Sequence, residues 1–375
     1  MNIKKPIYLL YKKVRNNRLS STVVNYVYTS VLGSLRKSSL QDVREAISSE
    51  ELDSGEIKVA FICDEMTWKN FSRECKCVFL TPKDWKKILK EFAPDILFCE
   101  SAWTGIEKYK NSWRGRIYKN ERLLCENRRT LLKIIDYCKK KEIATVFWNK
   151  EDPVYFDDPN YNYSNTAIKC DFVFTTAEEC VERYKALGHK NVKTLMFGIS
   201  PKLFNVAKNV QKRNVAVFAG SWYGDQSERC DELSRMFDMV LSNNIELEIY
   251  NRQSGSANSD YLFPEKYHPY IKDKVPYEQL TEIYKGAKYV ININTVKNSK
   301  TMFARRVFEA MACGCIVISN ESEGMRKHFS NRIWFLDEEF NHSIEQEIVH
   351  ENMEYVLKNH TYAGRMAEVL RCVKM

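Results

Sequence analysis

The run of residues 305–319 combines two arginines, a single carboxylate at Glu309, and a glycine followed by an apolar stretch. Good helix formers precede Gly314, and Ser299 or Thr301 could cap the start of a helix. Gly314 can take the left-handed conformation that ends a helix, so that the chain can turn into a buried strand. The pattern predicts a helix–strand unit of an α/β sheet.

The predicted helix carries the groups that a nucleoside diphosphate needs. Its N-terminus would offer unpaired N–H groups to a diphosphate, with Lys300, Thr301, Arg305 and Arg306 beside them. Glu309 would lie about 12 Å further along the helix, where a carboxylate can accept both hydroxyls of a ribose. In the alternative interpretation Glu309 is a solvated helix residue and the two arginines are ordinary surface charges.

Carboxylates follow three strand-like runs in the first half of the chain. Asp64 and Glu100 each follow one of these runs directly, and Glu151 with Asp152 follows the third. Ligands of open α/β sheets bind beyond the carboxyl ends of strands, and crowded like charges are costly unless a site uses them. We expect a general base among Glu151, Asp152, Glu100 and Asp64, in that order. The alternative for Glu151 and Asp152 is a turn formed before Pro153.

Smaller polar residues follow the strand-like runs of the second half. Gly220, Ser221 and Tyr223 come after one run, and Asn294 comes after another. A glycine would let the backbone approach a phosphate closely. We therefore expect these four residues to belong to the same nucleotide site as Glu309.

Strand-like and helix-like segments alternate along most of the chain, which predicts parallel βα units. The expected strands are 57–63, 95–99, 143–148, 171–175, 215–219, 246–250 and 289–293, and the expected helices are 83–92, 119–140, 178–187, one around Leu233 and Phe237, and 353–373. The polar stretch 201–214 interrupts the alternation. We predict a basic arm (1–50), two doubly wound Rossmann-like domains (51–207 and 208–350), and a C-terminal tail (351–375) whose helix returns to the first domain.

The basic character of the chain is confined to its first residues. The net charge is +9, but residues 1–41 hold eight Lys or Arg and no acid, which leaves +1 for the rest. Apolar residues alternate with these cations, so the arm could lie on an anionic bilayer or pack as a helix on the first domain. Because the charge forms one arm, nucleic-acid binding is not expected. No apolar run suits a membrane span or a signal peptide, which predicts a cytoplasmic protein, peripheral to the membrane if the arm binds it.

The twelve cysteines are scattered through strand-like runs. This distribution predicts reduced, buried thiols in a cytosolic protein and not a disulfide scaffold. No histidine-rich cluster accompanies them, and no Asp-x-Asp pair follows a strand, so we expect no metal and no cofactor.

Taken together, these segments resemble the CgeB-like glycosyltransferases, a bacterial group of GT-B proteins linked to spore-coat and cell-surface glycan assembly. The resemblance rests on 100–103 with Gly105, 148–153 with Tyr155 and Phe156, 218–221 with Tyr223 and Arg229, 275–277 before a helix ending at Tyr284, 306–314, and 360–362 with Arg365. It implies two Rossmann-like domains facing a cleft, with a nucleotide-sugar donor on the second and an acceptor on the first. Tyr277 joins the donor site on this basis.

The resemblance implies metal-independent transfer of a sugar, from a UDP-sugar as first expectation, to a hydroxyl of a cell-surface glycan or a lipid-linked precursor. The better-known retaining GT-B enzymes carry a second Glu eight positions before the ribose-binding one, where this chain has Thr301. The sugar and the stereochemical outcome are therefore not predicted. A nucleotide-sugar 2-epimerase of the same architecture and a non-catalytic nucleotide- or glycan-binding module are the alternatives.

Overall fold

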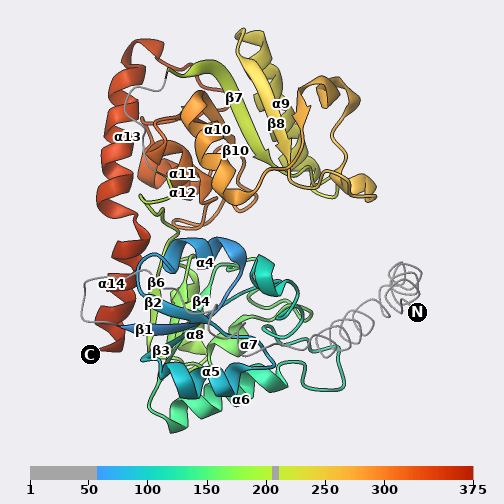
Figure 1. Cartoon of the computed structure of the whole chain (residues 1–375). Coiled ribbons are helices and arrows are strands. Elements are labelled where there is room, and N and C mark those ends of the chain that lie inside the picture. The colour runs from blue at the N-terminus through green and yellow to red at the C-terminus, as the bar shows by residue number, and fades with distance from the viewer. Residues whose placement is uncertain (1–56, 205–210, 375) are drawn as a thin grey trace. The chain divides into compact units, whose positions relative to one another are not determined.

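The computed structural model describes residues 57–204 and 211–374, which form two compact units (Figure 1). Of the described residues, the first unit contains 57–195 together with 368–374, and the second contains 196–204 and 211–367. The predicted basic arm, and with it the choice between membrane binding and packing, lies outside the described residues. No described helix is long and apolar enough to cross a membrane.

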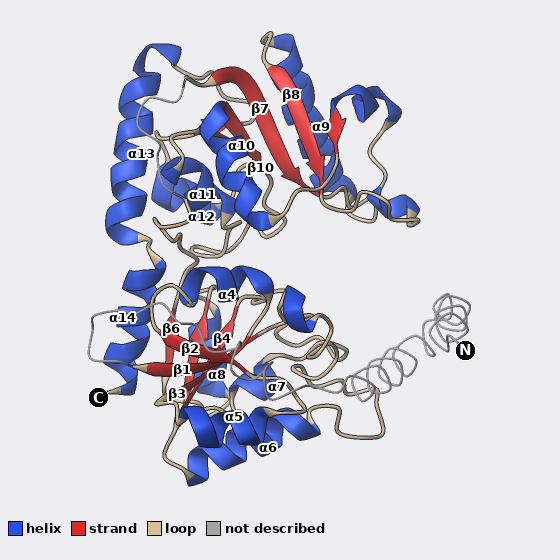
Figure 2. Cartoon of the chain, viewed as in Figure 1, coloured by secondary structure: helices blue, strands red, loops and turns tan. Residues whose placement is uncertain are grey.

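The first unit is built on a six-stranded parallel sheet of order β2-β1-β3-β4-β5-β6 (Figure 2). Its strands are β1 (Lys58–Ile62), β2 (Lys76–Phe79), β3 (Ile96–Glu100), β4 (Ala144–Asn149), β5 (Phe172–Thr175) and β6 (Val192–Thr194), and its helices include α4 (Glu65–Phe71), α5 (Trp85–Phe92), α6 (Arg129–Lys140), α7 (Ser164–Ala167) and α8 (Cys180–Ala186). β3 is buried along its whole length, as expected of a parallel strand covered on both faces. The strand order reverses between β1 and β3.

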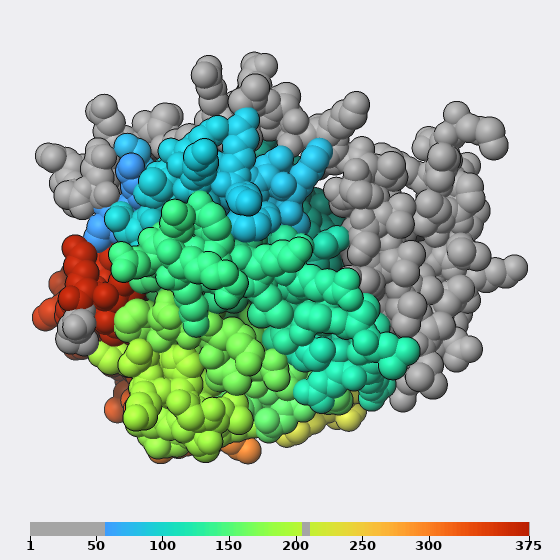
Figure 3. Space-filling view, turned by 90° about the horizontal axis from the view of Figure 1, so that it is seen from below, coloured from blue at the N-terminus to red at the C-terminus, as the bar shows by residue number. Residues whose placement is uncertain are grey.

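α5 and α6 lie on the face of this unit that the space-filling view shows (Figure 3). α6 buries Leu131, Ile134, Ile135 and Cys138, the spacing of one apolar helix stripe. The predicted helix 119–140 was too long at its start, because the side chain of Asn127 binds the preceding turns. Its Nδ2 donates to the carbonyls of Gly115 and Tyr118, and its Oδ1 accepts from the backbone of Asn120.

The second unit has a six-stranded parallel sheet of order β12-β11-β10-β7-β8-β9. Its strands are β7 (Arg213–Gly220), β8 (Glu246–Asn251), β9 (Ile271–Lys272), β10 (Ala287–Asn292), β11 (Ile316–Ser319) and β12 (Trp334–Phe335), and its α-helices are α9 (Ser227–Ser242), α10 (Leu280–Gly286), α11 (Arg306–Ala312), α12 (Glu323–Phe329) and α13 (Glu345–Asn359), followed by α14 (Tyr362–Val373). Here the order reverses between β7 and β10. All predicted strands are present, with small shifts at their ends.

Alternate side chains of β7 enter two separate cores, one on each face of the second sheet. Val215 and Val217 pack with residues of α10, α11, α12 and α13, whereas Ala216 and Phe218 pack with residues of α9. The period of two follows from the pleat of a strand. The sheet is therefore covered on both faces, and its carboxyl-end loops are left to form a site.

α11 begins at Arg306, so the predicted start at Ser299 or Thr301 was wrong. Polar side chains hold the preceding loop in an irregular path: Asn294 Oδ1 accepts from the backbone of Ala304, and Ser299 Oγ accepts from that of Met302. Glu309 lies in the first turn of the helix, not about 12 Å from its start.

Two other predicted features can be compared directly. Gly314 has φ +71°, the left-handed conformation expected after the helix. The predicted helix 353–373 is in fact two helices, α13 and α14, because the chain between them pairs with another segment. Ile199 donates to the carbonyl of His360 and accepts from the backbone of Tyr362, at 2.9 and 2.8 Å. These backbone bonds replace those that a continuous helix would make.

All twelve cysteines are free, and all except the half-buried Cys125 are buried. The expected burial of the cysteines is therefore found for all but Cys125 of the described residues, and none of them forms a disulfide.

Candidate functional site

An arginine spans the point where the strand order of the second sheet reverses. Arg306 Nη2 donates to the carbonyl of Ala219 in β7 at 2.8 Å, and its Nη1 lies 3.5 Å from the carbonyl of Ile291 in β10. The guanidinium also lies over the ring of Phe218, 5.1 Å from its centroid. In open α/β sheets this reversal point is where ligands bind.

Two further arginines reach the same strand end and meet at Ser221. Arg229, only 8% exposed, donates from both terminal nitrogens to the Ser221 carbonyl at 3.2 Å. Arg252 approaches Ser221 Oγ at 3.3 Å through Nε and donates to the hydroxyl of Tyr223 at 2.6 Å. We call Arg229, Arg252 and Arg306 the arginine cluster. Arg229 and Arg252 were not among the predicted site residues, because α9 and β8 bring them to Ser221 only in the folded chain.

No member of the arginine cluster forms an ion pair with an Asp or Glu of the described residues, although the charge of Glu309 acts on Arg306 and favours its charged form. Burial, with the charges of Arg306 and Arg252, lowers the pKa of Arg229 to about 10. The pKa of Arg306 is also lowered, chiefly by burial and in part by Arg252 and Arg305. Because the three positive charges disfavour one another, a bound anion would relieve their repulsion. The strand end is therefore suited to a diphosphate.

Glu309 is 1% exposed and forms a second set of polar contacts in the same unit, with Tyr277 and Arg305. Its Oε1 accepts from the Tyr277 hydroxyl at 2.6 Å and from Arg305 Nε at 2.9 Å, and Arg305 lies over the Tyr277 ring. Burial and the neighbouring Glu309 raise the pKa of Tyr277 well above its ordinary value. Among the described residues, the hydrogen-bond donors to Glu309 all contact Oε1, and Oε2 can accept from a ligand.

The other residues predicted for this site have different surroundings. Asn294 is buried and orders the loop before α11, while Gly220 ends β7, where a Cβ would meet the Phe218 ring at 2.5 Å. Lys300 is exposed and 4.0 Å from Glu323, and Thr301 is buried. α11 starts after both residues, so neither Lys300 nor Thr301 belongs to the helix.

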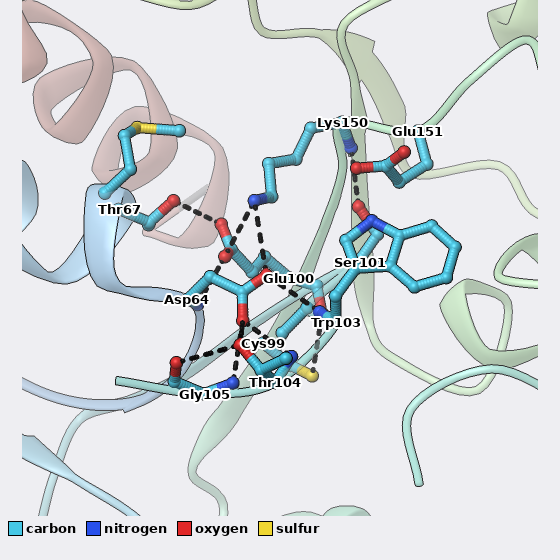
Figure 4. A network of polar contacts seen from close by, with 12 residues as sticks. Asp64, Thr67, Cys99, Glu100, Ser101, Trp103, Thr104, Gly105, Lys150 and Glu151 are labelled. Atoms are coloured by element: carbon cyan, nitrogen blue, oxygen red, sulfur yellow. Dashed lines mark hydrogen bonds and ion pairs between the residues drawn. The ribbon is translucent and has the colours of Figure 1, made fainter. Parts of the chain in front are cut away.

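In the first unit, Asp64 follows β1 at the reversal point of the sheet (Figure 4). Its carboxylate accepts from the backbone N–H groups of Trp103, Thr104 and Gly105 at 2.7, 2.9 and 2.7 Å. Gly105 has φ +98°, which favours a residue without a side chain. Asp64 thus fastens the loop that follows β3.

Glu100 and Lys150 form a buried pair beside Asp64. Lys150 Nζ lies 3.0 Å from Glu100 Oε1, which also accepts from the backbone of Asp64, and the Thr67 hydroxyl donates to Oε2. Burial raises the pKa of Glu100 to about 7 although Lys150 opposes the shift. Burial alone would lower the pKa of Lys150, but Glu100 and Asp64 outweigh it and raise the pKa. Glu100 is wholly buried and its oxygens are engaged.

Asp152 is also wholly buried and serves as an acceptor for three side chains. Asn149, Thr175 and Tyr184 donate to it at 2.7, 2.7 and 3.1 Å, which ties β4 to β5 and α8. Burial raises its pKa to about 7. These contacts favour a structural role for Asp152 over the role of a general base.

Glu151 is half-buried, as is Asp64, and lies beside the indole of Trp103 (Figure 4). Unlike the carboxylate of Asp64, that of Glu151 accepts no hydrogen bond from a backbone N–H group of the described residues. Burial raises its pKa, while Lys150 and a hydrogen bond from Trp103 oppose the shift. Of the four predicted candidates, it has the carboxylate best placed to take a proton from a bound molecule. Within residues 57–204 and 211–374, no three His, Cys, Asp or Glu side chains are grouped so as to hold a metal ion.

Comparison with known proteins gives one match to a family model. Residues 244–371 match the model of a family described as glycosyl transferase-like, a segment that includes Tyr277, Arg306 and Glu309. No curated protein has a significant sequence match to the chain.

Solved structures with a similar fold include an alpha-glucosyltransferase in complex with UDP-glucose and DNA containing an abasic site, with TM-score 0.56, 11% identity and coverage of 86% of this chain and 100% of that chain. A glycosyltransferase from Rickettsia africae has TM-score 0.52 at 11% identity, over 86% of this chain and 98% of that one. The sucrose-phosphate synthase from Thermosynechococcus elongatus has TM-score 0.50 at 9% identity, over 84% and 98%. The chain adopts the GT-B fold. The family match falls almost entirely within the second unit.

Proposed function

We propose that the protein transfers a sugar from a nucleoside-diphosphate sugar to an acceptor hydroxyl. The arginine cluster carries this proposal, because it concentrates three unpaired cations at a reversal point of the sheet. A similar structure was solved with UDP-glucose, so a UDP-sugar is the first donor to test. The acceptor we propose is a cell-surface glycan or its lipid-linked precursor, as in the CgeB-like group.

The arginine cluster would stabilise the charge that develops on the diphosphate as the bond to the sugar breaks. Hydrogen-bond donors and cations that are already in place are the most effective means of such stabilisation. Three guanidinium groups supply the positive charge that a divalent ion would otherwise bring. We therefore propose transfer that does not require a metal.

Glu309 would bind the ribose of the donor. A ribose diol can donate two hydrogen bonds to one carboxylate, and Oε2 of Glu309 is available for the first of them. Tyr277 and Arg305 hold the carboxylate in place through Oε1. This arrangement would orient the donor through its nucleoside.

Glu151 would act as general base toward the acceptor hydroxyl if the reaction inverts the anomeric carbon. A carboxylate whose pKa is raised toward the working pH is a better base than one in water. The acceptor would thus be bound by the first unit. Residues 1–41 could add attachment to an anionic membrane surface, where lipid-linked acceptors are found.

Thermal-shift screening against UDP, GDP, CDP and TDP, and their sugars, tests the donor class. A ligand at one hundred times its dissociation constant adds roughly 2.7 kcal/mol to the free energy of unfolding. A rise in melting temperature with one nucleotide supports the proposal, whereas no response to any of them would contradict it. Incubation with the selected sugar nucleotide alone separates transfer from epimerisation, because an epimerase would interconvert sugars without an acceptor.

A further inference from the structure

Four tyrosine rings gather around Trp103 beside Glu151. Trp103 lies in the loop after β3, and its ring centroid is 6.1, 5.4, 5.3 and 5.5 Å from those of Tyr118, Tyr155, Tyr161 and Tyr163. The rings of Tyr155, Tyr161 and Tyr163 cross that of Trp103 at 76°, 65° and 82°, an edge-to-face arrangement that aromatic side chains prefer, while the Tyr118 ring is tilted at 55°. We call these five residues the aromatic cluster.

Four of the five residues of the aromatic cluster lie outside the buried core. Trp103, Tyr118, Tyr155 and Tyr161 are half-buried, and only Tyr163 is fully buried. The core aromatics of the same unit, by contrast, have no exposed surface; they include Phe61, Phe71, Phe98 and Trp148. The cluster therefore presents ring surface to solvent at the carboxyl edge of the sheet, where ligands of such sheets bind.

Polar groups accompany the rings. Glu151 lies beside the Trp103 indole (Figure 4), and neither the Tyr118 nor the Tyr161 hydroxyl hydrogen-bonds to another described residue. Tyr163 donates to the carbonyl of Ala102 at 3.3 Å. A ligand held here would thus meet aromatic surface together with two phenol groups and one carboxylate.

This combination fits an uncharged sugar ring. A pyranose presents C–H bonds on its faces, which the electron-rich face of an aromatic ring attracts, and hydroxyls on its rim, which phenols and carboxylates hydrogen-bond. An anionic ligand fits poorly, because Asp64, Glu100 and Glu151 stand close by. Of the cations nearby, Lys150 is already paired with Glu100. The charge of Arg114 acts on the Tyr118 hydroxyl and favours its ionised form.

We propose that the aromatic cluster and Glu151 form a subsite for a neutral pyranose of the acceptor. This deepens the proposed function and rests on it. The acceptor oxygen would bond to the anomeric carbon of the donor sugar while the bond from that carbon to the diphosphate breaks. The diphosphate leaves with the electron pair, and the acceptor proton passes to Glu151.

Saturation-transfer NMR on the full chain tests the subsite, with the methyl pyranosides of glucose, galactose, mannose and N-acetylglucosamine as probes. We expect at least one of them to receive saturation on ring C–H protons. Tyr161→Leu and Trp103→Leu should reduce that signal at least fivefold, and Tyr161→Phe, which keeps the ring, should reduce it less.

Trp85→Leu is the matched control. Trp85 is also a half-buried tryptophan in an edge-to-face pair, 5.5 Å from Tyr137, but it lies at the start of α5, outside the aromatic cluster. The subsite is disproved if no pyranoside responds with the wild-type protein, or if Trp85→Leu loses as much signal as Trp103→Leu. Binding of a dT12 oligonucleotide that depends on Trp103 would also overturn it, in favour of a nucleic-acid acceptor.

A thermal shift with UDP, measured on the same samples, separates this inference from the proposed function. If UDP binds and no pyranoside does, the subsite fails while the donor site stands. If pyranosides bind through the cluster but no nucleotide binds, the subsite stands as a glycan-binding site and sugar transfer fails. A variant whose circular dichroism spectrum and melting temperature match those of the wild type is folded, so a loss of its sugar signal is not a loss of structure.

Discussion

Replacing Arg252 by Met should weaken nucleotide binding without destabilising the ligand-free protein. Arg252 is exposed, and its side chain hydrogen-bonds to the hydroxyls of Ser221 and Tyr223. Its charge lowers the pKa of both Arg229 and Arg306. Without ligand, the substitution therefore removes the repulsion between Arg252 and the other two arginines. With a nucleotide bound, it removes the attraction between Arg252 and the diphosphate.

The size of the effect follows from the bond that is lost. A hydrogen bond to a charged group contributes about 1.5–3 kcal/mol. Since about 1.4 kcal/mol changes affinity tenfold, the dissociation constant for UDP should rise by about 10- to 150-fold. Affinity should also depend less on salt, because one fewer cation contacts the diphosphate. The melting temperature of the ligand-free variant should stay the same or rise.

Titration calorimetry with UDP at low and high salt measures both quantities. Arg235→Met is the control, because Arg235 is also exposed and lies on α9, but it is paired with Asp337. The reasoning is refuted if Arg252→Met and wild type bind UDP equally, or if Arg235→Met weakens binding as much. A lower melting temperature of the ligand-free Arg252→Met variant would show that the cluster is structural.

Four further outcomes are expected. Glu309→Gln should weaken UDP binding by about 1.5–3 kcal/mol in calorimetry with little change in fold, since it keeps volume and loses charge; unchanged affinity would remove it from the site. Glu151→Gln should lower turnover by about 10²–10⁴-fold with UDP binding retained, and wild-type turnover should rise with pH through the raised pKa of Glu151, because the base must be ionised. Asp152→Asn should instead lower the melting temperature. Because its pKa is raised in the folded state, wild-type Asp152 contributes stability below about pH 4 that is lost as pH rises through about 7, and the variant should flatten that dependence in thermal denaturation. Lys212→Met should cost about 2–3 kcal/mol in urea unfolding, with the exposed Lys358→Met as control, because Lys212 Nζ donates to the carbonyls of Tyr284, Lys285, Ala287 and Cys313.

Helix limits were harder to predict than strands. The strands are short apolar runs buried on both faces, and such runs are visible in composition alone. The start of α11 depends instead on side chains that bind backbone groups outside the helix, as Asn294 does with Ala304. The break between α13 and α14 depends on Ile199, far away in the chain. Neither contact changes the pattern of apolar residues near the helix end, so neither can be predicted from that pattern.

The four candidate carboxylates of the first unit show that the sequence predicted the position of site residues better than their surroundings. Their position after strands predicted that Asp64, Glu100, Glu151 and Asp152 would meet at one sheet edge, and the strand ends lie as predicted. Their environments differ in ways that the sequence does not show. Three hydrogen-bond donors surround the buried Asp152, whereas the adjacent Glu151 stays half-buried beside Trp103.

The sequence by itself determined the alternation of strands and helices, the left-handed turn at Gly314, and the presence of polar residues after the strands. These are local properties, because each depends on the apolar pattern or the backbone freedom of a few neighbouring residues. Only the tertiary structure decided where each sheet reverses and which distant charges meet there. Arg229, Arg252 and Arg306 come from three separate segments, and they converge because β7 pairs with both β8 and β10. Strand pairing is a long-range choice, so the composition of any one segment cannot reveal the anion site that results.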